Sequence, residues 1–175
     1  PLTMAFTEVS LSDMGLLTPL MLLVIFLVAG ISLRSLVGSI LTAFIVIFSV
    51  IGMMGIAGWF KFILNAATFN SFLMLSALTI AHCVHIMSTQ KIHMRLGKNR
   101  KDAVDESLRV NLQPVFMTAI TTAIGFLTMH FSEAPPFRQL GYMMSFGNLV
   151  LFFHAVVTLP ALLVIIPSKI KATGY

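Results

Sequence analysis

The sequence predicts an all-α, polytopic membrane helix bundle with about five transmembrane helices and a short cytoplasmic amphipathic helix. Of its 175 residues, 58% are hydrophobic and only 10% are charged, and the mean hydropathy is +0.97. Soluble domains are about 25% charged, and folding at this size hides only about 70% of the chain's surface from water. This composition therefore excludes an ordinary soluble domain and favours a protein that is solvated by lipid.

The predicted spans follow from the stretches that lack Asp, Glu, Lys and Arg. Such stretches cover residues 14–33, 35–60, 62–90, 110–132 and 139–168. Each reaches the roughly 20 residues that a helix needs to cross a bilayer, and none alternates as β-barrel strands do. We place the five spans at about 15–33, 37–60, 69–90, 112–131 and 139–167.

The polar segments divide the rest of the chain. We expect residues 1–13 to be the end of a missing extracytoplasmic domain, 14–168 to be the transmembrane domain and 169–175 to be a cytoplasmic tail. Residues 91–111 form the longest polar loop, where Ala103, Val104 and Leu108 fall on one side of a helix. This pattern predicts an amphipathic helix lying on the inner membrane surface; the alternative is a solvated loop.

The positive charges predict the orientation. Nine of the eleven Lys and Arg residues lie on one side of the predicted membrane, and only Lys61 and Arg138 lie on the other. Cytoplasmic loops are enriched in Lys and Arg, so the nine-residue side is expected in the cytoplasm, together with the C-terminus of this segment. The same distribution explains the net charge of +5 better than nucleic-acid binding does. The expected location is the cell's inner (cytoplasmic) membrane.

Histidines are the main residues with a proton to exchange at membrane depth, because no carboxylate falls inside a predicted span. His82 and His85 are three residues apart and share a helix face, and an imidazole titrates near neutral pH. We predict them as proton-relay candidates, since ionisable groups inside a membrane are costly and often functional. Two alternatives remain: neutral packing residues, or a metal site completed by His154 or His130.

Hydroxyl groups mark a second set of candidates. Thr118, Thr121 and Thr122 follow the spacing of one helix face, and we expect this face to pack in the bundle with His82 pointing toward it. The alternative is that each threonine bonds to a carbonyl of its own helix. The polar-path candidates are Thr118, Thr121, Thr122, Asn148 and His154.

Known enzyme motifs are missing from the sequence. It has no Walker A, HExxH or GxSxG pattern, and its one cysteine, Cys83, implies no disulfide framework. We expect no enzyme activity, no catalytic residue, no cofactor and no bound metal. The expected partners are the lipid bilayer and a hydrophobic or lipid-like substrate, with no nucleic acid.

Several segments, in their order and spacing, resemble permeases of the resistance-nodulation-division (RND) superfamily, in the MMPL and sterol-sensing branch of hydrophobe exporters. The resemblance is carried by LTIAHCVHIMSTQ at 78–90, the TT-x-x-GF core at 121–126, FRQLGYMMSFGNLV at 137–150 and VTLPALLVI at 157–165. Residues 11–40 resemble the second helix of that branch and the turn after it. The chain would then be helices two to six of one six-helix half.

This resemblance implies a function and a partner. Members of the branch commonly export lipids or other hydrophobic molecules, driven by proton influx. The partner would be the other six-helix half of the same polypeptide or an oligomeric mate. A sterol-sensing or regulatory domain without transport of its own is the alternative, and a His-based membrane metalloenzyme is a third.

One position departs from the family pattern. Relatives carry an acid in the fourth helix where this chain has His82, while His85 matches a histidine that the branch often carries. Either His82 carries the proton, or the other half does, or this half has lost its coupling.

Overall fold

The computed structural model describes residues 35–166 and, before them, 19–20, 23–24, 27, 30–31 and 33. The predicted segments 1–13 and 169–175, and much of the first predicted span at 15–33, lie outside the described residues. The described part of the chain consists of helices and short connections, with no β-strand. The all-α prediction is therefore confirmed for this part of the molecule.

Four helical stretches in the described part are long and apolar enough to cross a membrane. They overlap the second to fifth predicted spans. The elements are α2 (Leu36–Trp59), α3 (Ala66–Arg95), α4 (Arg100–Leu127), the 3-10 turn η1 (Thr128–Phe131), α5 (Pro135–Phe153), the π-helical turn η2 (His154–Thr158) and α6 (Leu159–Ile165).

Polar caps fix where these helices begin. The Ser35 side chain accepts a hydrogen bond from the Gly38 amide at 3.3 Å at the start of α2. Asn65 accepts from two amides of the first turn of α3 and completes a capping box with Thr68. Each cap satisfies amides that would otherwise lack a partner at the helix end. At the other end of α3, Gly97 adopts φ +87°, a conformation that suits glycine and stops the helix.

A proline explains the π-helical turn within the last span. Pro160 has no amide hydrogen, and in a regular helix its ring would clash with the carbonyl four residues earlier. The wider turn at His154–Thr158 lies directly before it. Such insertions accommodate interruptions of the hydrogen-bond ladder, so α5, η2 and α6 continue as one stretch across the bundle.

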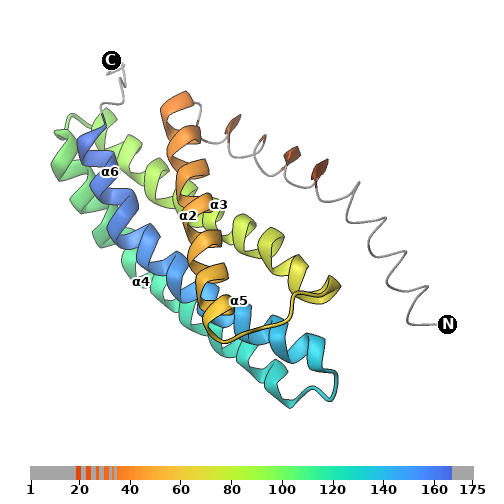
Figure 1. Cartoon of the computed structure of the whole chain (residues 1–175). Coiled ribbons are helices and arrows are strands. Elements are labelled where there is room, and N and C mark those ends of the chain that lie inside the picture. The colour runs from red at the N-terminus through yellow and green to blue at the C-terminus, as the bar shows by residue number, and fades with distance from the viewer. Residues whose placement is uncertain are drawn as a thin grey trace.

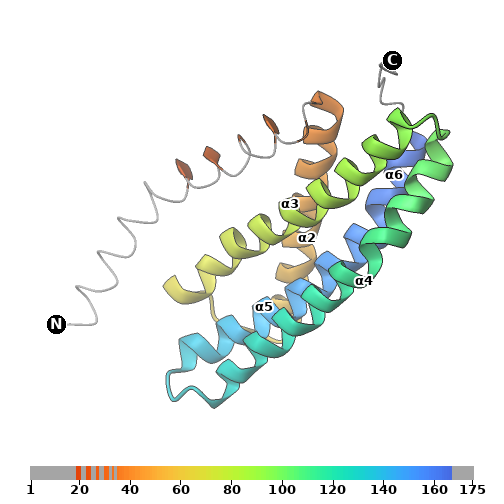
Figure 2. The ribbon, with the colours of Figure 1, turned by 180° about the vertical axis from the view of Figure 1, so that it is seen from behind.

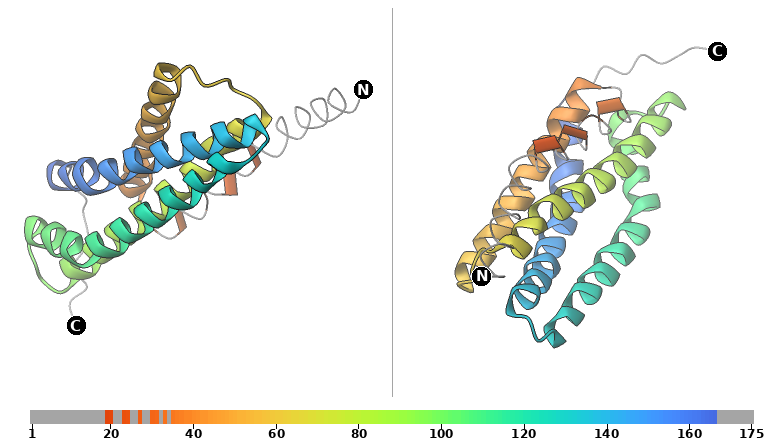
Figure 3. Two further views of the ribbon diagram at one scale, coloured as in Figure 1. Left: turned by 90° about the horizontal axis from the view of Figure 1, so that it is seen from below. Right: turned by 90° about the vertical axis from the view of Figure 1, so that its right-hand side faces the viewer.

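The helices run up and down, so that their ends gather at two poles of the bundle (Figure 1; Figure 2). The start of α2, the α3–α4 turn and the end of α6 share one pole, and the α2–α3 connection and η1 lie at the other. α4 packs beside α5 along the edge of the bundle (Figure 3). Only 17% of the most apolar stretch of the α4–η1 span is buried inside the bundle, compared with 50% of that of α3.

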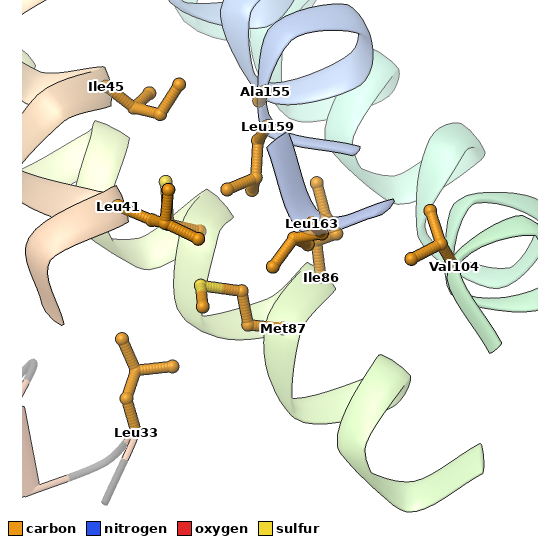
Figure 4. Packing of buried hydrophobic residues seen from close by; sticks show 10 residues of the cluster. Leu33, Leu41, Ile45, Ile86, Met87, Val104, Ala155, Leu159 and Leu163 are labelled. Carbon is orange, nitrogen blue, oxygen red and sulfur yellow. The ribbon is translucent and has the colours of Figure 1, made fainter. Parts of the chain in front are cut away.

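Apolar side chains from α2, α3, α4, η2 and α6 meet near the first pole (Figure 4). Val104 of α4 is 2% exposed and belongs to the same cluster as Ile86 of α3 and Leu163 of α6. The Ser107 hydroxyl donates to the Ile86 carbonyl at 2.5 Å and holds α4 to α3.

This packing corrects one prediction. Residues 101–109 do have an apolar face, but it packs on protein rather than on the membrane surface, and Ala103 is fully buried. The segment is the first part of the continuous helix α4, not a separate amphipathic helix. The sequence pattern does not distinguish a helix on the membrane surface from a helix packed in the bundle. In both cases an apolar stripe is buried, either by lipid or by neighbouring helices.

Candidate functional site

His82 lies close to the middle of the 30-residue helix α3, inside the bundle. Its side chain is only 4% exposed. Its Nδ1 atom is buried and makes no hydrogen bond within the described part of the chain. Buried polar atoms almost always have a partner, so this ring nitrogen marks His82 as the first candidate of the site.

A serine of α2 lies near the same depth. Val46 of α2 packs in one cluster with Ile80 of α3. Because α2 and α3 run in opposite directions, Ser49 falls near the level of Ala77, about one and a half helical turns from His82. Ser49 is fully buried, and its Oγ atom has no hydrogen-bond partner among the described residues.

An asparagine of α5 is a further buried polar residue in the bundle. A Cβ added to Gly52 would lie 2.7 Å from Val150 Cγ1, which shows how closely α2 and α5 approach each other here. Since α2 and α5 run in opposite directions, Asn148 lies about 7 Å beyond the level of Ser49, toward the second pole. It is 1% exposed; its Nδ2 donates to the Ala119 carbonyl of α4, whereas its Oδ1 is buried without a partner in the described residues.

Three helices thus supply buried polar groups near half height of the bundle. We call this set the midplane polar layer; it consists of Ser49, Thr79, His82, Ser145 and Asn148. Thr79 satisfies itself by donating to the Leu75 carbonyl at 2.7 Å. The remaining unsatisfied atoms are a ring nitrogen, a hydroxyl oxygen and an amide oxygen. Such a set can donate hydrogen bonds to a proton carrier and accept hydrogen bonds from it.

The structure separates the two predicted relay histidines. His82 is buried, whereas His85, one turn nearer the end of α3, is exposed. The shared helix face is therefore only partly covered by the bundle. Of these two histidines, only His82 belongs to the midplane polar layer.

The threonine face was predicted to pack in the bundle toward His82, and that expectation is wrong for the described residues. Thr118 and Thr121 are exposed, and Thr122 is half-buried. The Thr118 hydroxyl donates to the Pro114 carbonyl and the Thr121 hydroxyl to the Met117 carbonyl, each at 2.8 Å. The buried face of α4 carries smaller apolar residues, because α4 approaches α5 closely.

The other two histidines lie apart from the midplane layer. His154 starts the π-helical turn, is half-buried, and its Nδ1 lies 3.0 Å from the Val150 carbonyl of its own helix. His130 lies in η1 at the second pole, is exposed, and bonds to the Tyr142 hydroxyl. In the described residues, no three His, Cys, Asp or Glu side chains are grouped as metal ligands would be. The arrangement gives the metalloenzyme alternative no support.

Three members of the layer, Ser49, Thr79 and Ser145, were absent from the sequence-based candidates. Ser49 and Ser145 lie inside long apolar runs, where a serine is easily satisfied by its own helix. A weak signal was available: Ser49, Gly52 and Met53 fall on one side of α2, and small residues in membrane helices mark close contacts.

Comparison with known proteins agrees with the fold. Residues 2–172 match the MMPL family. Two similar proteins are the "Sulfolipid-1 exporter MmpL8" of Mycobacterium tuberculosis (strain CDC 1551 / Oshkosh) and the "Probable transport protein MmpL8" of Mycobacterium bovis (strain ATCC BAA-935 / AF2122/97). Each is 32% identical over 84 residues, which is 48% of this chain and 8% of the relative.

No solved structure gives a significant match to the chain. The matched segment spans less than a tenth of the curated relatives. The family match, in contrast, covers nearly every residue, including the whole described bundle and the midplane polar layer. The chain therefore belongs to the MMPL family of the RND superfamily and is a multi-pass membrane domain.

Proposed function

We propose that this domain takes part in proton-driven export of a lipid-like or hydrophobic substrate, with His82 as its proton-binding group. The observation that carries the proposal is the buried, unpartnered Nδ1 of His82 near half height of the bundle. The sulfolipid exporter named above supports the substrate class, since it shares the MMPL family.

The midplane polar layer supports a proton step at His82. A buried imidazole favours its neutral form, so the protonated form needs hydrogen-bond acceptors or water close by. Ser49 Oγ lies about one and a half turns from His82 along the bundle, and Asn148 Oδ1 lies further toward the second pole. Both are buried acceptors that are otherwise unpaired in the described residues. Within the spans of α2, α3 and α5, the described chain holds no carboxylate that could do the same work.

The uncovered face of α4 supports a second half as partner. Thr118, Thr121 and Gly125 follow one helix face, and all three are exposed. A Cβ added to Gly125 would meet no atom within 4 Å. Small and hydroxyl residues on a membrane helix favour close helix packing. We propose that the other six-helix half or an oligomeric mate covers this face, and that Thr118, Thr121 and Thr122 then border the polar path.

The proposal is tested with the full-length protein in liposomes. An imposed proton gradient is expected to drive movement of a fluorescent lipid-like substrate, and a protonophore is expected to stop it. Substrate movement that is equal with and without the gradient would contradict proton coupling. Substrate binding without any movement would favour the sterol-sensing alternative.

The proposed orientation makes a separate prediction. Asn99 and Pro135 are exposed at opposite poles of the bundle, and we place Asn99 in the cytoplasm because of the Lys and Arg bias. In intact cells, a membrane-impermeant thiol reagent should label a cysteine at position 135 but not one at position 99, which should react only after the membrane is opened. Cys83 is buried and should not react with the reagent in either case. Labelling of both positions from outside would reject this topology.

A further inference from the structure

The turn between α3 and α4 concentrates positive charge at the first pole of the bundle. Residues 95–101 contain Arg95, Lys98, Arg100 and Lys101, and no carboxylate. We call these seven residues the basic tip. Gly97, at φ +87°, reverses the chain here, and the Asn99 side chain accepts from the Asp102 amide to start α4. The backbone thus holds four cations on one tight turn.

Three of these cations are free of ion pairs in the described residues, and one of the three contacts a backbone carbonyl instead. Lys98 lies 3.4 Å from Glu106, which also pairs with Arg109. Arg100 reaches the Val164 carbonyl at 3.5 Å. Arg95 and Lys101 are exposed and form no ion pair in the described part of the chain. Arg95 and Lys101 therefore carry exposed positive charge that no ion pair in the described residues neutralises, although the exposed carboxylates of Asp102 and Asp105 follow in the sequence.

Apolar side chains lie next to this charge. Leu96 is 73% exposed and Ile92 is 55% exposed. The 30 residues of α3 span about 45 Å, whereas the hydrocarbon core is about 30 Å thick. The charge-free part of α3 ends at Gln90, and Leu96 follows about 9 Å further along the helix. The basic tip therefore lies at the headgroup layer, with the exposed Leu96 side chain beside the charges.

We propose that the basic tip binds the phosphate headgroup of an anionic phospholipid in the adjoining leaflet. Arg95 and Lys101 supply the charge, and Leu96 is an apolar anchor within the interfacial layer. Clustered Lys and Arg at the edge of a span attract anionic lipids in this way. The surface stands whether or not His82 carries a proton, and it is distinct from the midplane polar layer.

The test compares lipid binding by the full-length protein and by the double variant Arg95→Gln/Lys101→Gln. Native mass spectrometry with phosphatidylglycerol and phosphatidylcholine measures both affinities. The wild type should prefer phosphatidylglycerol. Each removed charge should weaken that binding roughly fivefold, or about 25-fold for the pair, and phosphatidylcholine binding should not change. Both side chains are exposed, so the variant should fold.

The matched control is Lys61→Gln/Arg138→Gln, which removes two exposed cations at the other pole. It should leave the preference for phosphatidylglycerol intact. Equal affinity of the wild type for both lipids, or equal losses in the two double variants, would overturn the proposal.

Free phosphate is separated from lipid by one further variant. Leu96→Gln should weaken phosphatidylglycerol binding several-fold, because it removes the apolar anchor, and 10 mM inorganic phosphate should not displace the lipid from the wild type. Displacement by phosphate, combined with normal binding by Leu96→Gln, would identify a simple anion site and reject the lipid surface.

Discussion

Replacing His82 with glutamine is expected to abolish the pH dependence of transport by the full-length protein. Glutamine keeps a polar side chain of similar reach but has no proton to exchange between pH 5 and 8. His82 is buried near half height of the bundle, so a relay through this half would lose its titrating group. Transport by the wild type and the variant is measured in liposomes across this pH range.

Two further variants make the result specific. His82→Asp introduces the acid that the family resemblance implies at this position, and it should retain some transport, with a shifted pH optimum. His85→Gln removes an exposed imidazole one turn away and should behave like the wild type. Normal transport by His82→Gln at every pH would make His82 a packing residue and assign any coupling to the other half.

The variant Gly141→Ala is expected to lose stability, although alanine is the better helix former. A Cβ at Gly141 would lie 2.5 Å from the Phe126 carbonyl oxygen and 2.8 Å from Met129 Cβ. A backbone oxygen cannot swing away as a side chain can, so α4 and α5 must separate. Overpacking of this kind costs roughly 1–3 kcal/mol. The measurement is thermal unfolding of the purified full-length protein.

Gly55→Ala in α2 provides the matched control. Its Cβ would meet nothing within 4 Å, and alanine gains up to about 1 kcal/mol over glycine in helix propensity. This variant should therefore unfold at the wild-type temperature or slightly above it. Equal behaviour of the two alanine variants would mean that α4 and α5 do not approach each other as described.

The fold class could be predicted from the sequence because the bilayer imposes a simple rule. A segment that crosses lipid must satisfy its backbone internally and must exclude charge, and both requirements are visible in the charge-free runs. The exact ends were less predictable. α4 continues back to Arg100 because its first turns pack on Ile86 and Leu163, a contact between segments far apart in the sequence.

The candidate site was only partly predictable for the same reason. His82 and Asn148 stood out because polar groups inside a span are costly. Ser49 and Ser145 did not stand out, since their burial depends on which faces of α2 and α5 meet. The threonines of α4 looked like a packing face by spacing alone, yet α4 turns other residues inward, and Thr118 and Thr121 bond to their own helix.

The most direct measurement of the central claim is proton movement itself. Full-length protein in liposomes that contain a pH-sensitive dye is supplied with a lipid-like substrate, and proton flux is recorded together with substrate movement. The account predicts that the wild type and His85→Gln move protons with substrate, whereas His82→Gln moves none. Equal, substrate-dependent proton flux in His82→Gln and the wild type would contradict it.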